Sequence, residues 1–334
     1  MIRVREPWVI VLAGGSGERL RSVTTTAAGE SIPKQFCRLG GRQSMLGMTL
    51  ARARRITAAD RILVLVRQEH RAWWQDELVA IRPEQVLVQS RNRGTGLALL
   101  RALLHLHERD PDACVVVLPS DHVVDDEDLL SRAVLDAVDA ARVHTGQVVL
   151  IGAPAGAADP SLGWILPERG GTGRTRQVAG FVEKPSSEEA AACVRRGALR
   201  NTLILAGNVR ALLRVYALEM LAPLGTAEVP DDVLQTTISG LAAIYAEVPG
   251  MDLSRDILQP SSRWLRVLPL PECGWTDIGT LERLEAWWKS HPRSFMEVRK
   301  FGVLPVPSQS RPELVDRELV AATGTDDHVG EGTA

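Results

Sequence analysis

The sequence has no long apolar run, no closely spaced cysteines and no large excess of either charge. No apolar stretch approaches the roughly 20 residues that a membrane-spanning helix requires. The first residues, Met1–Glu6, lack the apolar segment of a signal peptide. The cysteines are scattered at positions 37, 114, 193 and 273 and form no C-x-x-C pair, so they indicate neither zinc nor redox chemistry. We therefore expect a cytoplasmic protein that does not enter a membrane.

The charge balance is close to neutral. The 334 residues carry a formal net charge of -2, which gives no electrostatic reason to expect binding to nucleic acid or to an anionic membrane. Any phosphate site must therefore be a local cluster of basic groups. The length and the 45% hydrophobic content suit a globular chain with one large α/β domain or two medium ones.

Apolar runs alternate with amphipathic stretches over the first half of the chain. The predicted strands are Val9–Ala13, Arg61–Val66, Gln85–Gln89, Ala113–Leu118 and Gln147–Ile151. The predicted helices between them are Ser44–Arg55, Glu69–Ile81, Gly96–Glu108 and Glu127–His144. This βαβα order predicts an α/β fold with a doubly wound, mostly parallel sheet. Because ligands bind at the carboxyl ends of such strands, the loops after Ala13, Gln89 and Leu118 should share one crevice.

The pattern changes after Ile151, where short strands and turn clusters predict an inserted mixed-sheet lobe at roughly 152–275. The predicted strands are Trp164–Leu166, Val178–Val182, Leu203–Leu205 and Arg263–Leu268, and the predicted helices are Ser187–Arg196, Val209–Leu221, Asp231–Ala246 and Thr280–Ser290. We expect one main domain over 1–290 and a C-terminal extension over 291–334, whose polar end is disordered.

A glycine-rich loop follows the first predicted strand. It reads GGSG at residues 14–17, and glycines let backbone N–H groups approach an anion closely. Arg19 and Lys34 can supply positive charge. No Lys-Ser or Lys-Thr follows, as a Walker A loop requires, and no glycine lies three residues after Gly17, as a dinucleotide fingerprint requires. A plain tight turn is the competing interpretation.

Four later segments place charged groups beside predicted strand ends or turns. They read PKQF at 33–36, VVVLPSDH at 115–122, FVEKP at 181–185 and WTDIGT at 275–280. Each has an ordinary structural interpretation as well, such as a solvated lysine, a surface ion pair or a helix-capping aspartate. Taken one at a time, these segments leave the structural interpretations open.

Together these segments resemble the family of sugar-1-phosphate nucleotidyltransferases, the NDP-sugar pyrophosphorylases. The matching stretches are LAGGSGERL at 12–20, PKQF at 33–36, RNRGT at 91–95, PSDH at 119–122, FVEKP at 181–185 and GWTDIG at 274–279. The resemblance implies a Rossmann-like fold of the nucleotide-diphospho-sugar transferase type, with a sugar-binding lobe. PKQF and RNRGT favour the guanylyl branch, which makes GDP-mannose and pyrophosphate from GTP and mannose-1-phosphate. Two alternatives stay open: UTP or dTTP with glucose-1-phosphate, and a non-catalytic relative that binds a nucleotide sugar.

The resemblance also implies roles for individual residues. Asp121 and Asp277 would bind Mg²⁺, which prefers oxygen ligands, and Arg19 and Lys34 would hold the triphosphate and the leaving pyrophosphate. The implied nucleotide-binding residues are Leu12, Ala13, Gly14, Gly15, Gly17, Asn92, Gly94 and Thr95. The implied sugar-phosphate-binding residues are Gly163, Glu183, Lys184 and Asn201. GTP and a hexose-1-phosphate are the implied partners, without nucleic acid or membrane, and a homo-oligomer is left open.

The sequence departs from many mannose enzymes around the sugar site. It has Arg200-Asn201-Thr202-Leu203 where they have Trp-Asn-Ser-Gly, and Gly96 stands where a proline is usual after the threonine. These departures leave the reaction class unchanged and the identity of the sugar open.

Overall fold

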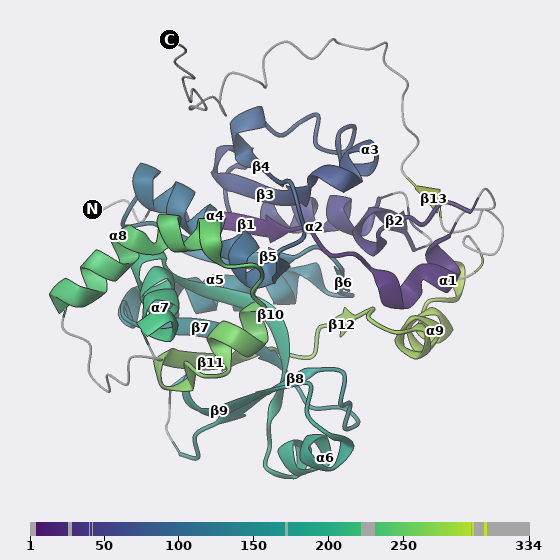
Figure 1. Cartoon of the computed structure of the whole chain (residues 1–334). Helices are drawn as coiled ribbons and strands as arrows, with labels where there is room; N and C mark the ends of the chain where they lie inside the picture. Colours follow the sequence, from purple (N-terminus) through teal and green to yellow (C-terminus); the bar gives the residue numbers. More distant parts are fainter. Residues whose placement is uncertain are drawn as a thin grey trace, which may run out of the picture.

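A nine-stranded sheet runs through the centre of the molecule, with the strand order β4-β3-β1-β5-β10-β7-β11-β9-β8 (Figure 1). The computed structural model describes residues 5–25, 29–39, 41, 43–170, 173–221, 231–294, 296 and 304–305. The strands of the sheet are β1 (Trp8–Leu12), β3 (Ile62–Arg67), β4 (Val86–Gln89), β5 (Cys114–Pro119), β7 (Val148–Ala153), β8 (Gly163–Pro167), β9 (Arg176–Glu183), β10 (Leu199–Asn208) and β11 (Leu265–Pro269).

The sheet is parallel over its first four strands and mixed beyond them. Strand β1 pairs in parallel with β3 and β5, and β3 pairs in parallel with β4. Strand β10 runs antiparallel to both β5 and β7, whereas β7 and β11 are parallel. The predicted doubly wound α/β class is therefore confirmed. The short strands predicted for an inserted lobe, in β8, β9 and β10, extend the same sheet, and the division into domains stays a prediction.

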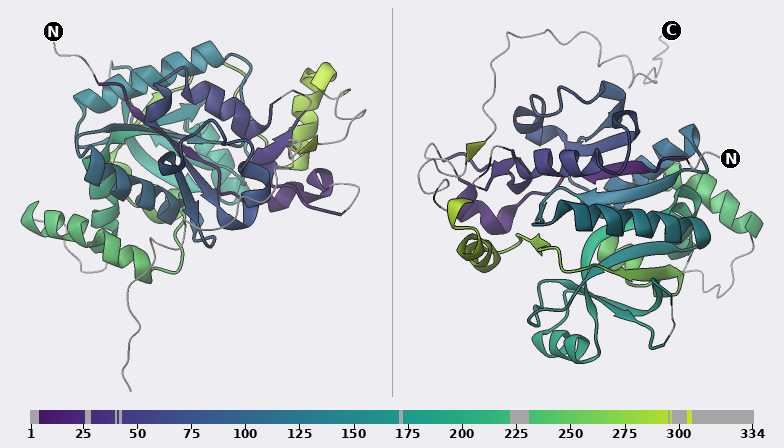
Figure 2. Two further views of the ribbon diagram at one scale, coloured as in Figure 1. Left: turned by 90° about the horizontal axis from the view of Figure 1, so that it is seen from above. Right: turned by 180° about the vertical axis from the view of Figure 1, so that it is seen from behind.

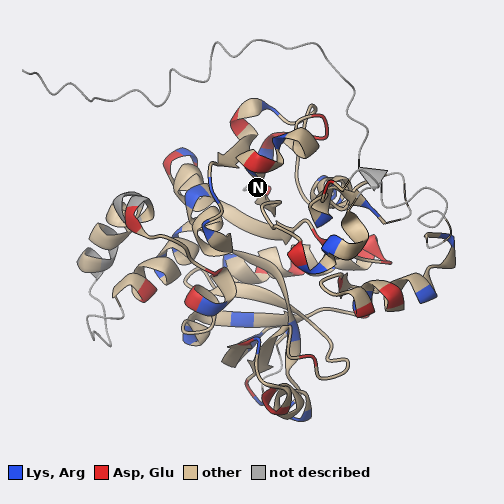
Figure 3. Cartoon of the chain, turned by 45° about the vertical axis from the view of Figure 1, so that its right-hand side comes forward, with Lys and Arg blue, Asp and Glu red and all other residues tan. Residues whose placement is uncertain are grey.

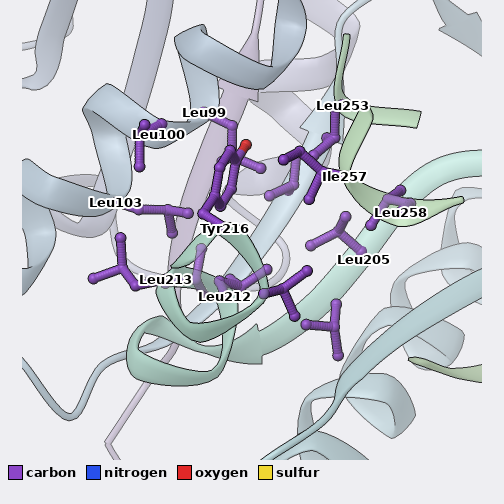
Figure 4. Close-up of a cluster of buried hydrophobic side chains, with 14 of the residues drawn as sticks. Leu99, Leu100, Leu103, Leu205, Leu212, Leu213, Tyr216, Leu253, Ile257 and Leu258 are labelled. Carbon is purple, nitrogen blue, oxygen red and sulfur yellow. The ribbon is translucent and has the colours of Figure 1, made fainter. Parts of the chain in front are cut away.

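Helices cover both faces of the sheet, because strands with two buried faces need an apolar layer on each side. One face packs against α4 (Gly94–Arg109), α7 (Val209–Leu221) and a π-helical turn at Leu253–Leu258. Figure 4 shows this cluster, in which leucines of α4 and α7 surround Tyr216. The opposite face packs against α2 (Met45–Ala53) and α5 (Glu127–Val143), which come forward in the view from behind (Figure 2).

Most predicted helices are confirmed within a few residues. They include α6 (Ser187–Arg195), α8 (Asp231–Glu247) and α9 (Leu281–Ser290). The helix predicted over Glu69–Ile81 is wrong for more than half of its length, because a 3-10 turn at Gln68–His70 and α3 (Arg71–Trp74) are followed by turns. The end of the chain that was predicted to be disordered lies outside the described residues.

Two small two-stranded sheets join the C-terminal part of the described chain to segments from its first half. Strand β12 (Thr276–Asp277) pairs with β6 (His122–Val123), and β13 (Leu304–Pro305) pairs with β2 (Cys37–Arg38). A short helix, α1 (Arg21–Thr24), follows the glycine-rich loop. The β6–β12 pairing brings the segment around Asp121, just after β5, next to Asp277, more than 150 positions further along the chain.

The charged side chains are mixed in sign over the surface. Figure 3 shows acidic and basic residues interspersed along most helices, as the small net charge leads one to expect. Among the described residues, no helix combines the length and the apolar character that crossing a bilayer requires.

Candidate active site

The glycine-rich loop leaves β1 at Leu12 and is held in place by its neighbours. Gly17 has φ +65°, and a Cβ there would lie 2.8 Å from the backbone nitrogen of Lys34, so no larger residue fits without a shift. The buried Gln35 side chain donates hydrogen bonds to the carbonyl oxygens of Ala13 (3.0 Å) and Gly15 (2.9 Å). The PKQF segment therefore fixes the path of the loop as well as supplying a lysine.

A cavity of about 290 Å³ lies at the carboxyl edge of the parallel strands. It is lined by residues after β1, β4 and β5, so the prediction that these loops share one crevice is confirmed. The predicted site residues that line it are Leu12, Gly14, Gly15, Asn92, Gly94, Thr95 and Asp121. Ala13 does not line it, because its side chain is fully buried and its backbone pairs with Leu65 and Gln35.

A second cavity of about 250 Å³ adjoins the first along the glycine-rich loop. Its lining includes Gly17, Arg19, Lys34 and Gly279. The two cavities share Gly15, Ser16, Gln35 and Asp121. Two adjacent hollows on either side of one loop can accommodate different parts of an extended anionic molecule.

The ammonium group of Lys34 lies where the predicted carboxylates meet. Its Nζ is 3.0 Å from Oδ2 of Asp121 and 3.3 Å from Oδ1 of Asp277, and it donates to the carbonyl oxygen of Ile278 at 2.6 Å. Burial raises the pKa of Asp121, but the Lys34 ammonium and His122 outweigh this effect and lower the pKa to about 2. Asp121 is thus ionised throughout the neutral range.

A tryptophan holds His122 next to this group. The indole N–H of Trp275 donates to Nδ1 of His122 at 3.3 Å, and the rings pack edge to face. Burial lowers the pKa of His122 although the carboxylates of Asp121 and Asp277 oppose this, so the ring is neutral near pH 7. His122 therefore serves to pack the β6–β12 pair.

The two aspartates suit a magnesium ion that also binds substrate oxygens. No group of three or more histidine, cysteine or acidic side chains within the described ranges has the geometry to hold a metal alone. Magnesium commonly takes one or two protein carboxylates and completes its octahedron with phosphates and water. Asp121 Oδ2 and Asp277 Oδ1 each keep a second lone pair beside their pairing with Lys34.

The residues predicted for the sugar side lie together at the start of β8. Gly163 stands opposite Glu183 in the register of β8 and β9. A Cβ on Gly163 would lie 2.5 Å from Oε2 of Glu183 and 3.2 Å from Cβ of Asn201. Lys184 lies 3.3 Å from Glu183, whose side chain is only 9% exposed. Burial raises the pKa of Glu183, and Lys184 opposes this shift.

The RNRGT segment packs against a distant part of the chain. Gly94 has φ +82°, and a Cβ there would overlap the carbonyl oxygen of Met251. The amide of Gly96 donates to the same oxygen at 2.9 Å, a bond that a proline could not make. Thr95 Oγ1 accepts from the amide of Leu253 at 3.1 Å. These contacts place Asp252 in the wall of the first cavity.

Several polar residues of the site had no role in the sequence analysis. Four of them are Gln35, Gln89, Asp252 and Arg283. Gln35 lies inside a segment that the sequence analysis singled out, and Gln89 ends a predicted strand. Asp252 and Arg283 reach the site only through tertiary packing, so no local pattern marks them.

The comparisons place the chain in a family. The nucleotidyl transferase family matches residues 8–291, and the chain belongs to it. Alginate biosynthesis protein AlgA of Pseudomonas putida is 30% identical over 302 residues, which cover 85% of this chain and 58% of that protein. Mannose-1-phosphate guanylyltransferase of Escherichia coli is 32% identical over 198 residues, which cover 56% of this chain and 40% of that protein. The chain thus spans only about half the length of these relatives.

Solved structures show the same fold. A crystal structure described as mannose-1-phosphate geranyltransferase from Thermus thermophilus superimposes with a TM-score of 0.68 at 24% identity, covering 87% of this chain and 79% of that one. An inositol-1-phosphate CTP transferase from T. maritima superimposes with a TM-score of 0.56 at 15% identity, covering 87% and 96% of the two chains. The sugar-phosphate nucleotidyltransferase fold is therefore shown.

Proposed function

We propose that this protein is a sugar-1-phosphate nucleotidyltransferase that forms GDP-mannose and pyrophosphate from GTP and mannose-1-phosphate. The observation that carries the proposal is the meeting of Asp121 and Asp277 at the Lys34 ammonium, beside two adjoining cavities. Membership of the nucleotidyl transferase family and the relatives named above support it.

The proposed reaction is a direct attack of a sugar-phosphate oxygen on the α-phosphorus of GTP, with loss of pyrophosphate. The attacking phosphate is already anionic at neutral pH because its second pKa is about 6, so the site needs no general base. Its task is to bring two anions together and to stabilise the charge on the triphosphate. Lys34 and the exposed Arg19 border the second cavity, where they would bind the departing pyrophosphate.

Asp121 and Asp277 would hold Mg²⁺. When bound, the ion would neutralise part of the charge on the phosphates. Lys34 keeps Asp121 ionised and therefore ready to act as a ligand.

The first cavity would hold the nucleoside. The side-chain nitrogen of Gln89 is buried there without a hydrogen-bond partner within the described structure, and Asp252 also lines this cavity. Guanine presents the carbonyl O6 as an acceptor and its ring N–H and amino group as donors, so an amide and a carboxylate can both bind its edge. This pairing favours GTP.

The cluster around Gly163 would hold the hexose. The absence of a side chain at Gly163 lets the side chains of Glu183 and Asn201 pack directly against its backbone. Glu183 would accept hydrogen bonds from sugar hydroxyls, and Lys184 would bind the sugar phosphate as a point charge.

A substrate panel tests the proposal. Purified protein with MgCl₂ is given each of the common nucleoside triphosphates with mannose-1-phosphate or glucose-1-phosphate, and the nucleotide sugars are separated by ion exchange. We expect GDP-mannose to form fastest, and the variants Asp121→Asn and Asp277→Asn to form none while remaining folded by circular dichroism.

The panel also separates the alternatives. Faster formation of UDP-glucose or dTDP-glucose would keep the reaction class and change the substrates. Thermal stabilisation by a nucleotide sugar with no turnover for any pair would identify a binding protein and overturn the enzymatic proposal.

A further inference from the structure

Arg283 in the first turn of α9 reaches back to the aspartate that precedes the helix. Its Nη1 lies 3.2 Å from Oδ2 of Asp277, and its Nη2 donates to Oγ of Ser161 at 3.2 Å. The same guanidinium lies 3.9 Å from Asp159, and its side chain is only 17% exposed. One largely buried arginine side chain therefore links Asp277 to the loop between β7 and β8.

The local structure is built around this guanidinium. Thr280 caps α9 by accepting from the backbone amide of Arg283, so the helix starts where this side chain can turn toward Asp277. A Cβ on Gly279 would lie 2.6 Å from Nη2 of Arg283 and 2.8 Å from Oδ2 of Asp277. The glycine of the WTDIGT segment thus leaves the space that the arginine and the carboxylate fill.

The two oxygens of Asp277 are held by different cations. Lys34 pairs with Oδ1 and Arg283 with Oδ2, so the carboxylate cannot rotate without losing one partner. Groups that orient a metal-binding carboxylate in this way determine how well it binds the ion.

The loop that Arg283 holds also leads directly into the sugar side of the site. Ser161 lies two residues before Gly163, and the intervening Leu162 accepts a hydrogen bond from the amide of Lys184 at 3.3 Å. The same short segment therefore contacts both Arg283 and the lysine proposed to bind the sugar phosphate.

We propose that Arg283 is a positioning residue that couples Asp277 to the sugar-phosphate subsite, so that the carboxylate and the incoming phosphate keep a fixed relation. The proposal rests on the proposed nucleotidyltransfer. Arg283 acts through Asp277 and Ser161 and need not touch a substrate. Its loss would disturb the sugar side and the metal requirement more than the nucleoside side.

The kinetic test compares Arg283→Gln, Arg283→Lys and the control Lys289→Gln, which removes an exposed cation from the same helix. We expect Arg283→Gln to lower kcat/KM for mannose-1-phosphate about 10- to 100-fold, as loss of a group behind a metal ligand typically does. The Mg²⁺ concentration for half-maximal rate should rise, and the KM for GTP should stay unchanged. Arg283→Lys should restore part of the loss, and the control should match the wild type.

A second test needs no turnover. Arg283→Gln, Ser161→Ala and the double variant are compared by thermal unfolding without ligands, and contact between the residues predicts non-additive shifts of the midpoint. Additive shifts, or wild-type kinetics for Arg283→Gln, would overturn the role of Arg283. A wild-type protein that makes no nucleotide sugar would instead refute the proposed function. The thermal unfolding of the three variants would still test whether Arg283 and Ser161 interact.

Discussion

The Lys34 ammonium lies 3.3 Å from a carboxylate oxygen of Asp277, although 243 positions separate the two residues. The same nitrogen lies 3.0 Å from Asp121, and the lysine side chain is only 6% exposed. One buried cation thus joins the segment after the glycine-rich loop, the end of β5 and the β12 strand. The proposed chemistry depends on this arrangement.

Replacing Lys34 by methionine should lower kcat at least about 100-fold, a loss typical of removing one preorganised group that stabilises transition-state charge. The two carboxylates would then face each other without their shared cation, and the pKa of Asp121 would rise toward its usual range. Initial rates with GTP and mannose-1-phosphate measure the first effect. Lys289→Met is the matched control, and a Lys34→Met rate close to that of the control would contradict the role of Lys34.

Gly94 should be essential for stability whatever its part in nucleotide binding. Alanine there would have φ +82° and a Cβ overlapping the Met251 carbonyl, so Gly94→Ala should destabilise the fold by about 1–3 kcal/mol. Gly15 lies in open space without a positive φ, and Gly15→Ala should leave the unfolding free energy unchanged. Urea unfolding measures the free energy of unfolding of both variants. Equal values would show that the close approach of Gly94 to Met251 does not contribute to stability.

Glu183→Gln should separate stability from activity. Burial raises the pKa of Glu183, so folding disfavours its charged form, and the cost to stability develops as pH rises above the unfolded pKa of about 4.3. Glutamine should therefore raise the unfolding temperature at pH 7 and lose this advantage as the pH falls below that value. The variant should bind mannose-1-phosphate more weakly, because an acceptor is lost. A stabilisation that is equal at pH 7 and pH 4 would argue against a buried charge at this position.

Gln35→Leu should weaken the binding of the nucleotide without affecting that of the sugar phosphate. The substitution leaves the carbonyls of Ala13 and Gly15 without their side-chain donor, and the loop becomes free to shift. A loss of about 1.4 kcal/mol in loop positioning corresponds to about a tenfold rise in the KM for GTP. Steady-state kinetics with each substrate varied in turn measures the two KM values. A rise confined to the KM for mannose-1-phosphate would contradict a role of Gln35 in positioning the nucleotide-binding loop.

The sequence is informative where the structure follows from local pattern. Two apolar runs predict β1 and β5, and an amphipathic stretch predicts α5. The bounds of all three elements are correct within one or two residues. The Glu69–Ile81 stretch has a helical spacing of apolar residues, yet turns satisfy the burial of Leu78 and Ile81 equally well. Periodicity reports which positions are buried and does not fix the backbone that buries them.

Some residues of the candidate site could be predicted from local sequence, and others could not. Asp121 follows a predicted parallel strand, so its place at the ligand edge could be predicted from the sequence. Glu183 and Lys184 come at the end of β9, which runs antiparallel to both of its neighbours, so only the family resemblance indicated them. Arg283 and Asp252 have no such signal. Their positions depend on how α9 and the Met251–Leu253 segment pack against residues far away in the chain.

Tracing labelled phosphorus through one reaction tests the central claim most directly. The protein is incubated with mannose-1-phosphate, Mg²⁺ and GTP labelled with ³²P at either the α or the γ position, and the products are separated by chromatography. Nucleotidyl transfer predicts that the α label appears in GDP-mannose and the γ label in pyrophosphate. A γ label in inorganic phosphate or on the sugar, with no α label in a nucleotide sugar, would contradict the account.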